Sequence, residues 1–190
     1  QRREPVQIPL DLGHRTALGR KDFIAAPCNE NALLWIDRWP NWPATGLSFY
    51  GSPGCGKTHL AEIWGARSGA VKIAATSLRG KDAAEINLDA PALIIENLNA
   101  AVPAHTLLHL YNLMGERDGH ILFTAIEAPA QMGFRLPDIL SRLRAMPAIS
   151  IADPDDVVLG AAMRKMFEDR QLPVGDDIIS FLLARMARSF

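Results

Sequence analysis

The stretch with the clearest chemistry is glycine-rich and reads Gly51-Ser-Pro-Gly-Cys-Gly-Lys-Thr58. It matches the G-x-x-x-x-G-K-[ST] pattern at every fixed position. In such a loop the glycines let backbone N–H groups curl around a phosphate, and the following helix adds the positive end of its dipole. We expect Lys57 to reach the β- and γ-phosphates and Thr58 to offer its hydroxyl to Mg²⁺. The expected nucleotide contacts in this loop are Pro53, Gly54, Cys55, Gly56, Lys57 and Thr58.

A second candidate is the apolar run Leu93-Ile-Ile-Glu96-Asn97, which resembles a Walker B strand that delivers an acid to the Mg²⁺ shell. Glu96 replaces the usual Asp, and Asn97 stands where a catalytic Glu would be. An amide can orient water but cannot take its proton. We therefore expect weak or no intrinsic ATPase activity, so the classification as an enzyme stays open. The alternative is a buried strand that ends in polar turn residues.

Arg142 lies in Ser141-Arg-Leu143, just before the last expected strand. An arginine there can point out of the subunit and act on a neighbour's γ-phosphate as an arginine finger. The alternative is that Arg142 and Arg144 are plain surface charges. His105 and His109 have a spacing that can hold zinc, but no third ligand is evident, so a metal role is not expected.

The elements that must position these residues alternate along the chain. The expected strands are 47–50, 71–75, 92–95, 120–124 and 148–151. They are apolar and continuous, as expected for strands covered on both faces. Helical patterns lie between most of them, including 29–38 and a helix that starts near Lys57. This alternation predicts an α/β fold with a parallel sheet.

From Asp153 onward only helical patterns remain. Asp153 and Pro154 read as an N-cap followed by Pro at the first helical position. The apolar residues of the two helices are Leu159, Met163, Met166 and Phe167, and then Ile179, Leu182, Leu183 and Met186. The chain is thus divided into an extended arm (1–22), a nucleotide-binding α/β domain (23–152) and a small, incomplete helical lid (153–190).

Composition excludes several classes of protein. The chain has 190 residues, of which 48% are hydrophobic, and its net charge is −1. This balance does not favour strong direct DNA binding, which usually needs a basic excess. Cys28 and Cys55 are too few for a disulfide scaffold, and neither a signal peptide nor a membrane span is visible, so a cytoplasmic protein is expected. Trp35, Trp39 and Trp42 are interpreted as core rather than as a stacking platform.

Three segments together resemble the AAA+ proteins related to the replication initiator DnaA. They are Gly56-Lys-Thr-His59-Leu60, Ser141-Arg-Leu143 and Ala187-Arg188-Ser189. Within this clade the chain resembles the Hda family, in its α-proteobacterial form, over nearly its whole length. The residues that carry this likeness are Leu107-Leu-His-Leu-Tyr-Asn112 with Ile121-Leu-Phe-Thr124, a Walker B ending in acid-Asn, and the arm Gln7-Ile-Pro-Leu-Asp-Leu12.

The resemblance implies a AAA+ P-loop core with a lid, holding ADP or ATP with Mg²⁺. It implies that His59 and Arg188 contact the nucleotide, that Thr58 and Glu96 hold the metal, and that Arg142 is an arginine finger. The arm residues Gln7, Ile8, Leu10 and Leu12 would dock on the β sliding clamp. The implied role is stimulation of ATP hydrolysis by DnaA, which prevents re-initiation of DNA replication. A second copy of the chain is a further candidate partner.

Two departures from the initiators support a regulator. Residues 76–91 leave little room for the extra DNA-contacting helix of DnaA, and no helix-turn-helix follows the lid. The position expected to hold a polar sensor residue after Thr124 reads Ala125-Ile-Glu127, and the sequence does not assign it. Two rival functions stay open, namely an initiator or helicase-loading ATPase and a scaffold with a structural nucleotide. For the arm, the alternative is an edge strand or flap packed on its own domain.

Overall fold

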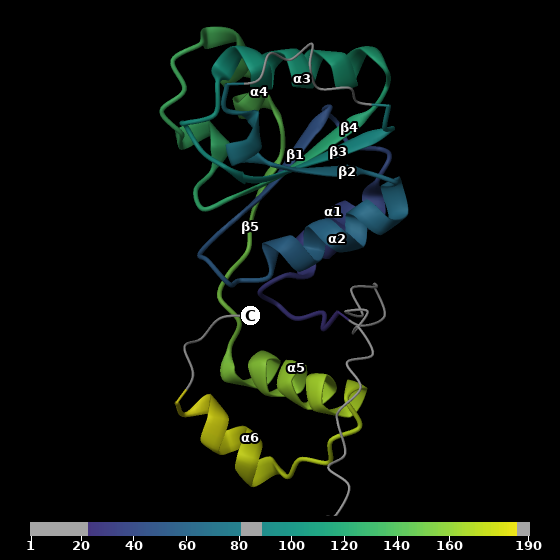
Figure 1. The fold of residues 1–190 in the computed structure, drawn as a ribbon, viewed down its shortest axis with the longest axis vertical. Helices are drawn as coiled ribbons and strands as arrows, with labels where there is room; N and C mark the ends of the chain where they lie inside the picture. Colours follow the sequence, from purple (N-terminus) through teal and green to yellow (C-terminus); the bar gives the residue numbers. More distant parts are fainter. Residues whose placement is uncertain (1–22, 81–88, 186–190) are drawn as a thin grey trace, which may run out of the picture.

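The computed structural model describes residues 23–80 and 89–185, which form a sheet covered by helices and then a helical pair (Figure 1). The strands are β1 (Gly46–Tyr50), β2 (Val71–Ala74), β3 (Ala92–Leu98), β4 (His120–Ala125) and β5 (Ala148–Ser150). The helices are α1 (Glu30–Arg38), α2 (Lys57–Ser68), α3 (Ala104–Glu116), α4 (Pro137–Ala145), α5 (Asp156–Asp169) and α6 (Asp176–Leu183). Short 3₁₀ turns are η1 (Ala75–Leu78) and η3 (Pro129–Gln131).

The sheet has the order β2-β3-β4-β1-β5, and every strand pair in it is parallel. This confirms the predicted α/β class. β4 separates β1, which leads into the glycine-rich loop, from β3, which carries Glu96. Tyr50 and Leu98 both pair with Ala125 of β4. The glycine-rich loop and the end of β3 therefore meet at the carboxyl edge of the sheet, where ligands bind in open α/β folds.

Helices cover both faces of the sheet but leave parts of its edge strands exposed. α1 and α2 lie on one face and α3 and α4 on the other (Figure 1). The expectation of strands covered on both faces holds for β1, β3 and β4 but was wrong for β2 and β5. Val71 of β2 is 45% exposed, and β5 exposes Ala148 and Ser150. Both strands lie at sheet edges, where they have a neighbour on one side only.

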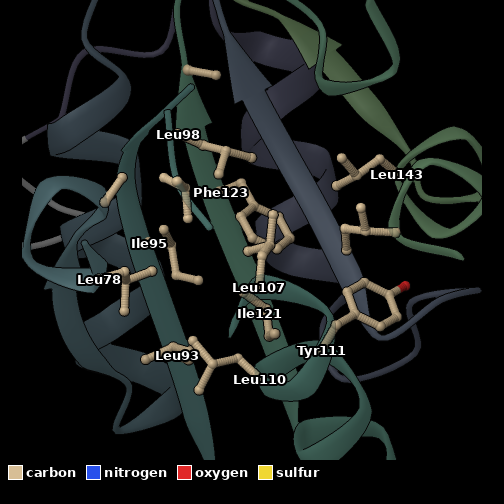
Figure 2. Packing of buried hydrophobic residues seen from close by; sticks show 14 of the residues in the cluster. Leu78, Leu93, Ile95, Leu98, Leu107, Leu110, Tyr111, Ile121, Phe123 and Leu143 are labelled. Carbon is tan, nitrogen blue, oxygen red and sulfur yellow. The ribbon is translucent and has the colours of Figure 1, made fainter. Parts of the chain in front are cut away.

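The core on the α3 and α4 face is aliphatic and aromatic. Leu93 and Ile95 of β3 point into it together with Ile121 and Phe123 of β4, and Leu107 of α3 packs over them (Figure 2). All five are fully buried. Residues two apart along a strand share a face, so the alternate residues of β3 point the other way. One of these is Glu96.

The core on the α1 and α2 face contains a tryptophan cluster. Trp64 of α2 is fully buried, and Trp42 stacks on it with ring centroids 5.1 Å apart. Trp39 meets Trp64 edge-on at 6.3 Å, and the indole N–H of Trp42 donates to the carbonyl of Trp35. The interpretation as core is confirmed for Trp42, whereas Trp35 and Trp39 are partly buried against the same cluster. They tie the segment after α1 to the phosphate-loop helix α2.

Two helices of the structure differ from the sequence-based prediction. α4 was not predicted, because Ile139 and Leu143 are its only buried residues and give too short a pattern. α5 begins later than expected: its N-cap is Asp155, whose side chain accepts a hydrogen bond from the Val158 N–H. Asp153 lies outside the helix.

The buried face of α5 also differs from the expected one. Met166 is 54% exposed, whereas Val158, Leu159 and Gly160 are buried. The reason is that α6 packs near the start of α5, where a Cβ at Gly160 would lie 3.4 Å from Leu183. Met186, expected on the face of α6, lies outside the described residues. In the described part of the chain, no helix is long and apolar enough to cross a membrane.

We expect Trp64→Ala to lower the free energy of unfolding by about 3–5 kcal/mol, because it leaves a large cavity beside the Trp42 and Trp39 rings. Chemical denaturation monitored by circular dichroism measures this. Leu34→Ala on α1 is the matched control, since Leu34 is 62% exposed and its truncation should cost little. Equal losses in the two variants would contradict a core built on Trp64.

Candidate functional site

The glycine-rich loop has a backbone that side chains would not tolerate. Gly51 has φ +156°, and a Cβ at this position would lie 2.3 Å from the carbonyl oxygen of Ile151. Gly54 and Gly56 have φ +78° and +97°, a region that glycine populates readily. Gly56 is the N-cap of α2. The loop therefore turns sharply from β1 and delivers the chain into α2, whose first N–H groups have no partner within the helix.

The side chain of Lys57 is buried inside this loop and binds its backbone. Its side chain is 8% exposed, and its ammonium donates to the carbonyl oxygens of Gly51 (2.8 Å) and Ser52 (2.7 Å). The Cys55 Sγ lies 3.5 Å from the same ammonium and is buried, which fits the interpretation of Cys55 as a small packing residue. A positive charge is thus fixed at the centre of a loop of backbone amides, an arrangement suited to an anion.

The loop is also bound to the segment that leads into α5. The Ser52 hydroxyl donates to the Asp153 carboxylate, and the Ile151 N–H donates to the carbonyl of Tyr50 at 2.7 Å. The Ala152 N–H donates to the carbonyl of Cys28 at 3.2 Å. The connection between the sheet and the last two helices therefore starts at the phosphate loop itself.

Two predicted nucleotide contacts lie around the start of α2. Pro53 is exposed on the loop, and His59 is half-buried with its ring edge-on to Phe23 at 4.8 Å. Arg188, the third contact expected from the lid, lies outside the described residues.

The predicted metal residues lie beside the same helix. Thr58 is exposed in the first turn of α2. Glu96 is on the α2 face of β3, with its side chain 18% exposed, and its Oε1 atom is enclosed without a hydrogen-bond partner in residues 23–80 and 89–185. A hydroxyl and a carboxylate are oxygen donors of the kind that a hydrated Mg²⁺ accepts, so these residues fit the ion. No group of three or more His, Cys, Asp or Glu is gathered in the described residues.

The sequence missed the buried hydroxyl of Thr124. The Asn97 N–H donates to the Thr124 Oγ1 atom at 3.1 Å, and Thr124 is 1% exposed on β4. This bond lies where the pairing of β3 and β4 becomes irregular, between Ile95 and Leu98. Thr124 is the polar residue within the apolar run of β4, and this break in the pattern could have identified it from the sequence. Of the next residues, Ala125 is buried and Ile126 is exposed.

Arg142 and Arg144 differ in their surroundings. Arg144 is exposed, whereas Arg142 is half-buried with its guanidinium carbon 5.6 Å from the centre of the Tyr111 ring. The Arg142 Nε atom is enclosed and has no hydrogen-bond partner among the described residues. Burial raises the pKa of Tyr111, and its ring lies 2.9 Å from the position of a Cβ on Gly46. Arg142 is therefore held against the aromatic core by α4 rather than projecting freely.

The Arg142 side chain and the phosphate loop lie at opposite ends of β1. Tyr111, which contacts Arg142, packs against Gly46 at the start of that strand, and the loop begins after Tyr50 at its end. At about 3.3 Å per residue these ends are roughly 15 Å apart. The structure does not bring Arg142 to the chain's own phosphate loop.

Gln7, Ile8, Leu10 and Leu12 of the arm lie outside the described residues. The same applies to positions 81–88 of the short segment that was expected to lack the DnaA insertion.

No family model matches the sequence, and no curated protein matches it. Solved structures do match. A DNA replication initiation factor has a TM-score of 0.73 at 16% identity, covering 87% of this chain and 59% of its own. DnaA domain III from Thermotoga maritima matches with a TM-score of 0.71 at 17% sequence identity, and the match covers 94% of this chain and 82% of that one. AMPPCP-bound DnaA from Aquifex aeolicus matches with a TM-score of 0.72 at 16% identity, and the match covers 88% of this chain and 60% of that one.

The described residues have the AAA+ fold of DnaA domain III. At sequence identities of 16–17%, these matches establish a shared fold. The chain spans about 60% of the length of the longer proteins that it matches, DnaA from Aquifex aeolicus among them. The sheet order and the glycine-rich loop after β1 thus belong to a fold that this chain shares with these solved structures.

Proposed function

We propose that this chain is a nucleotide-bound AAA+ regulator of the Hda type. Together with the β sliding clamp it stimulates ATP hydrolysis by DnaA and so prevents re-initiation of replication. The observation that carries this proposal is the place of Arg142, which is held on Tyr111 at the opposite end of β1 from the phosphate loop. Because that place is remote from the chain's own phosphate loop, the nucleotide of a neighbouring subunit is the target of Arg142 in this proposal.

The nucleotide is held by the phosphate loop in this proposal. The ammonium of Lys57 and the first N–H groups of α2 contact the phosphates, with Pro53, Gly54, Cys55, Gly56 and His59 around them and Arg188 from the lid. DnaA from Aquifex aeolicus, which has the same fold, was solved with AMPPCP bound. Thr58 and Glu96 hold Mg²⁺, which when bound offsets phosphate charge.

In this proposal the nucleotide is retained as ADP because Asn97 stands where a catalytic base would be. Asn97 follows Glu96 at the carboxyl end of β3 and is exposed. Its amide can orient a water molecule but cannot accept the proton that hydrolysis releases. Rapid turnover by the isolated protein would instead favour an initiator or helicase-loading ATPase.

We expect Lys57→Ala to weaken ADP binding by at least about tenfold, because the phosphates lose a charge that the loop holds in place. Isothermal titration of nucleotide-free protein measures this. Arg38→Ala is a matched control, since Arg38 is an exposed cation at the end of α1. Unchanged affinity in Lys57→Ala would contradict the loop as the phosphate site.

We expect Arg142→Ala to leave the fold and the ADP affinity unchanged while the stimulation of DnaA collapses. Arginine fingers supplied by a partner are worth about 10³–10⁵ in rate in GTPases. The measurement is ATP turnover by DnaA with this protein and DNA-loaded clamp. Arg144→Ala is the control, an exposed arginine on the same helix. No stimulation by the wild-type chain would contradict the regulator, and full stimulation by Arg142→Ala would contradict the finger.

The arm provides the clamp contact in this proposal, with Gln7 at the rim of a pocket and Ile8, Leu10 and Leu12 as apolar contacts. Short peptides of this kind concentrate binding energy in a few anchors. We expect Leu10→Ala combined with Leu12→Ala to abolish clamp binding while the thermal midpoint barely moves. Titration against purified clamp and a melting curve test this. Retained binding with a large loss of stability would make the arm a structural element.

A further inference from the structure

A lysine lies between two carboxylates beside the phosphate-loop helix. The ammonium of Lys72, on β2, forms a close ion pair with Glu62 of α2 and lies 3.9 Å from the Glu96 Oε2 atom of β3. The Lys72 and Glu62 side chains are 43% and 27% exposed, so this cluster lies at the surface near the edge of the sheet. A lysine ammonium is ordinarily charged at neutral pH, and here it lies between two carboxylates.

This cluster adjoins the place where a divalent cation would be held. Glu62 follows Thr58 by four residues on α2, so the two side chains lie on one face of the helix, a turn apart. Glu96 pairs in register with Ala74, two residues after Lys72 on β2. The ammonium thus reaches up the sheet toward the carboxyl edge, where the glycine-rich loop lies.

The charges of this cluster are incompletely balanced. Two carboxylates and one ammonium leave a net charge of −1, which becomes −2 without Lys72. A nucleoside diphosphate brings further negative charge to the loop one turn of α2 away. Coulomb repulsion over such distances near a protein surface amounts to about 1–2 kcal/mol per charge pair. Lys57 lies at the phosphates themselves, and Lys72 is the cation that lies between the two carboxylates.

We propose that Lys72 is a built-in counter-ion of the nucleotide site. By neutralising Glu96 it lets this chain bind a nucleoside diphosphate with little dependence on Mg²⁺. The charge of Lys72 determines this dependence, and Glu62 positions the ammonium. The proposal rests on the proposed nucleotide binding at the phosphate loop, and it is independent of the regulatory role toward DnaA.

The test is the ratio of two dissociation constants for ADP, one measured in EDTA and one in excess Mg²⁺. For the wild-type chain we expect a ratio below about threefold. For Lys72→Met we expect about tenfold or more, because Glu62 and Glu96 then face the phosphates without a counter-charge. Lys72→Arg keeps the charge and should behave as wild type. Arg38→Met removes an exposed cation elsewhere and should leave the ratio unchanged.

Each outcome decides something. A Lys72→Met ratio equal to that of the wild type, or a wild-type ratio of tenfold or more, overturns the role of Lys72 while nucleotide binding stands. Wild-type protein that binds no ADP in either buffer overturns the phosphate-loop proposal and the role of Lys72 with it. Lys72→Gln is measured alongside, with melting curves for all variants, so that a loss of folding in one variant is recognised. Agreement of the Met and Gln variants at the higher ratio supports the proposal.

Discussion

The close approach of the phosphate loop to the end of β5 constrains everything around the site. Gly51 passes so near the Ile151 carbonyl that no side chain fits, and the Ile151 N–H is bonded to Tyr50 on the other side. The loop, the end of β1 and the chain leaving β5 thus form one connected backbone unit. The segment toward α5 starts at this unit, and its Asp153 carboxylate accepts a hydrogen bond from Ser52, so the loop and the start of the last two helices are joined directly.

The two ends of β1 separate two kinds of chemistry. The carboxyl end delivers a loop of amides around Lys57, and the amino end supports Tyr111 and, on it, the guanidinium of Arg142. A subunit built this way offers an anion site at one place and a cation at another. If both act on nucleotide, two subunits must meet head to tail, a heterologous contact that leaves one site of a pair uncompleted.

Local patterns made part of this structure predictable. The glycine-rich loop was found because its residues are adjacent in sequence, and the central strands because both their faces are apolar. The edge strand β2 was misjudged because burial depends on neighbours that the sequence does not show. The contacts of Arg142 with Tyr111 and of Lys72 with Glu96 join residues more than twenty positions apart. Such pairs follow from the order of strands and helices, which spacing along the chain does not encode.

Asn97 shows how one residue can satisfy a structural and a chemical constraint together. Its φ is +58°, in the left-handed region that asparagine tolerates better than most residues with a side chain. This conformation directs its N–H to the buried Thr124 hydroxyl and coincides with the irregular pairing of β3 and β4. A glutamate would meet more strain in that backbone, while an amide meets less and cannot act as a base. The backbone at the end of β3 thus favours asparagine, the residue whose amide can orient water but cannot take its proton.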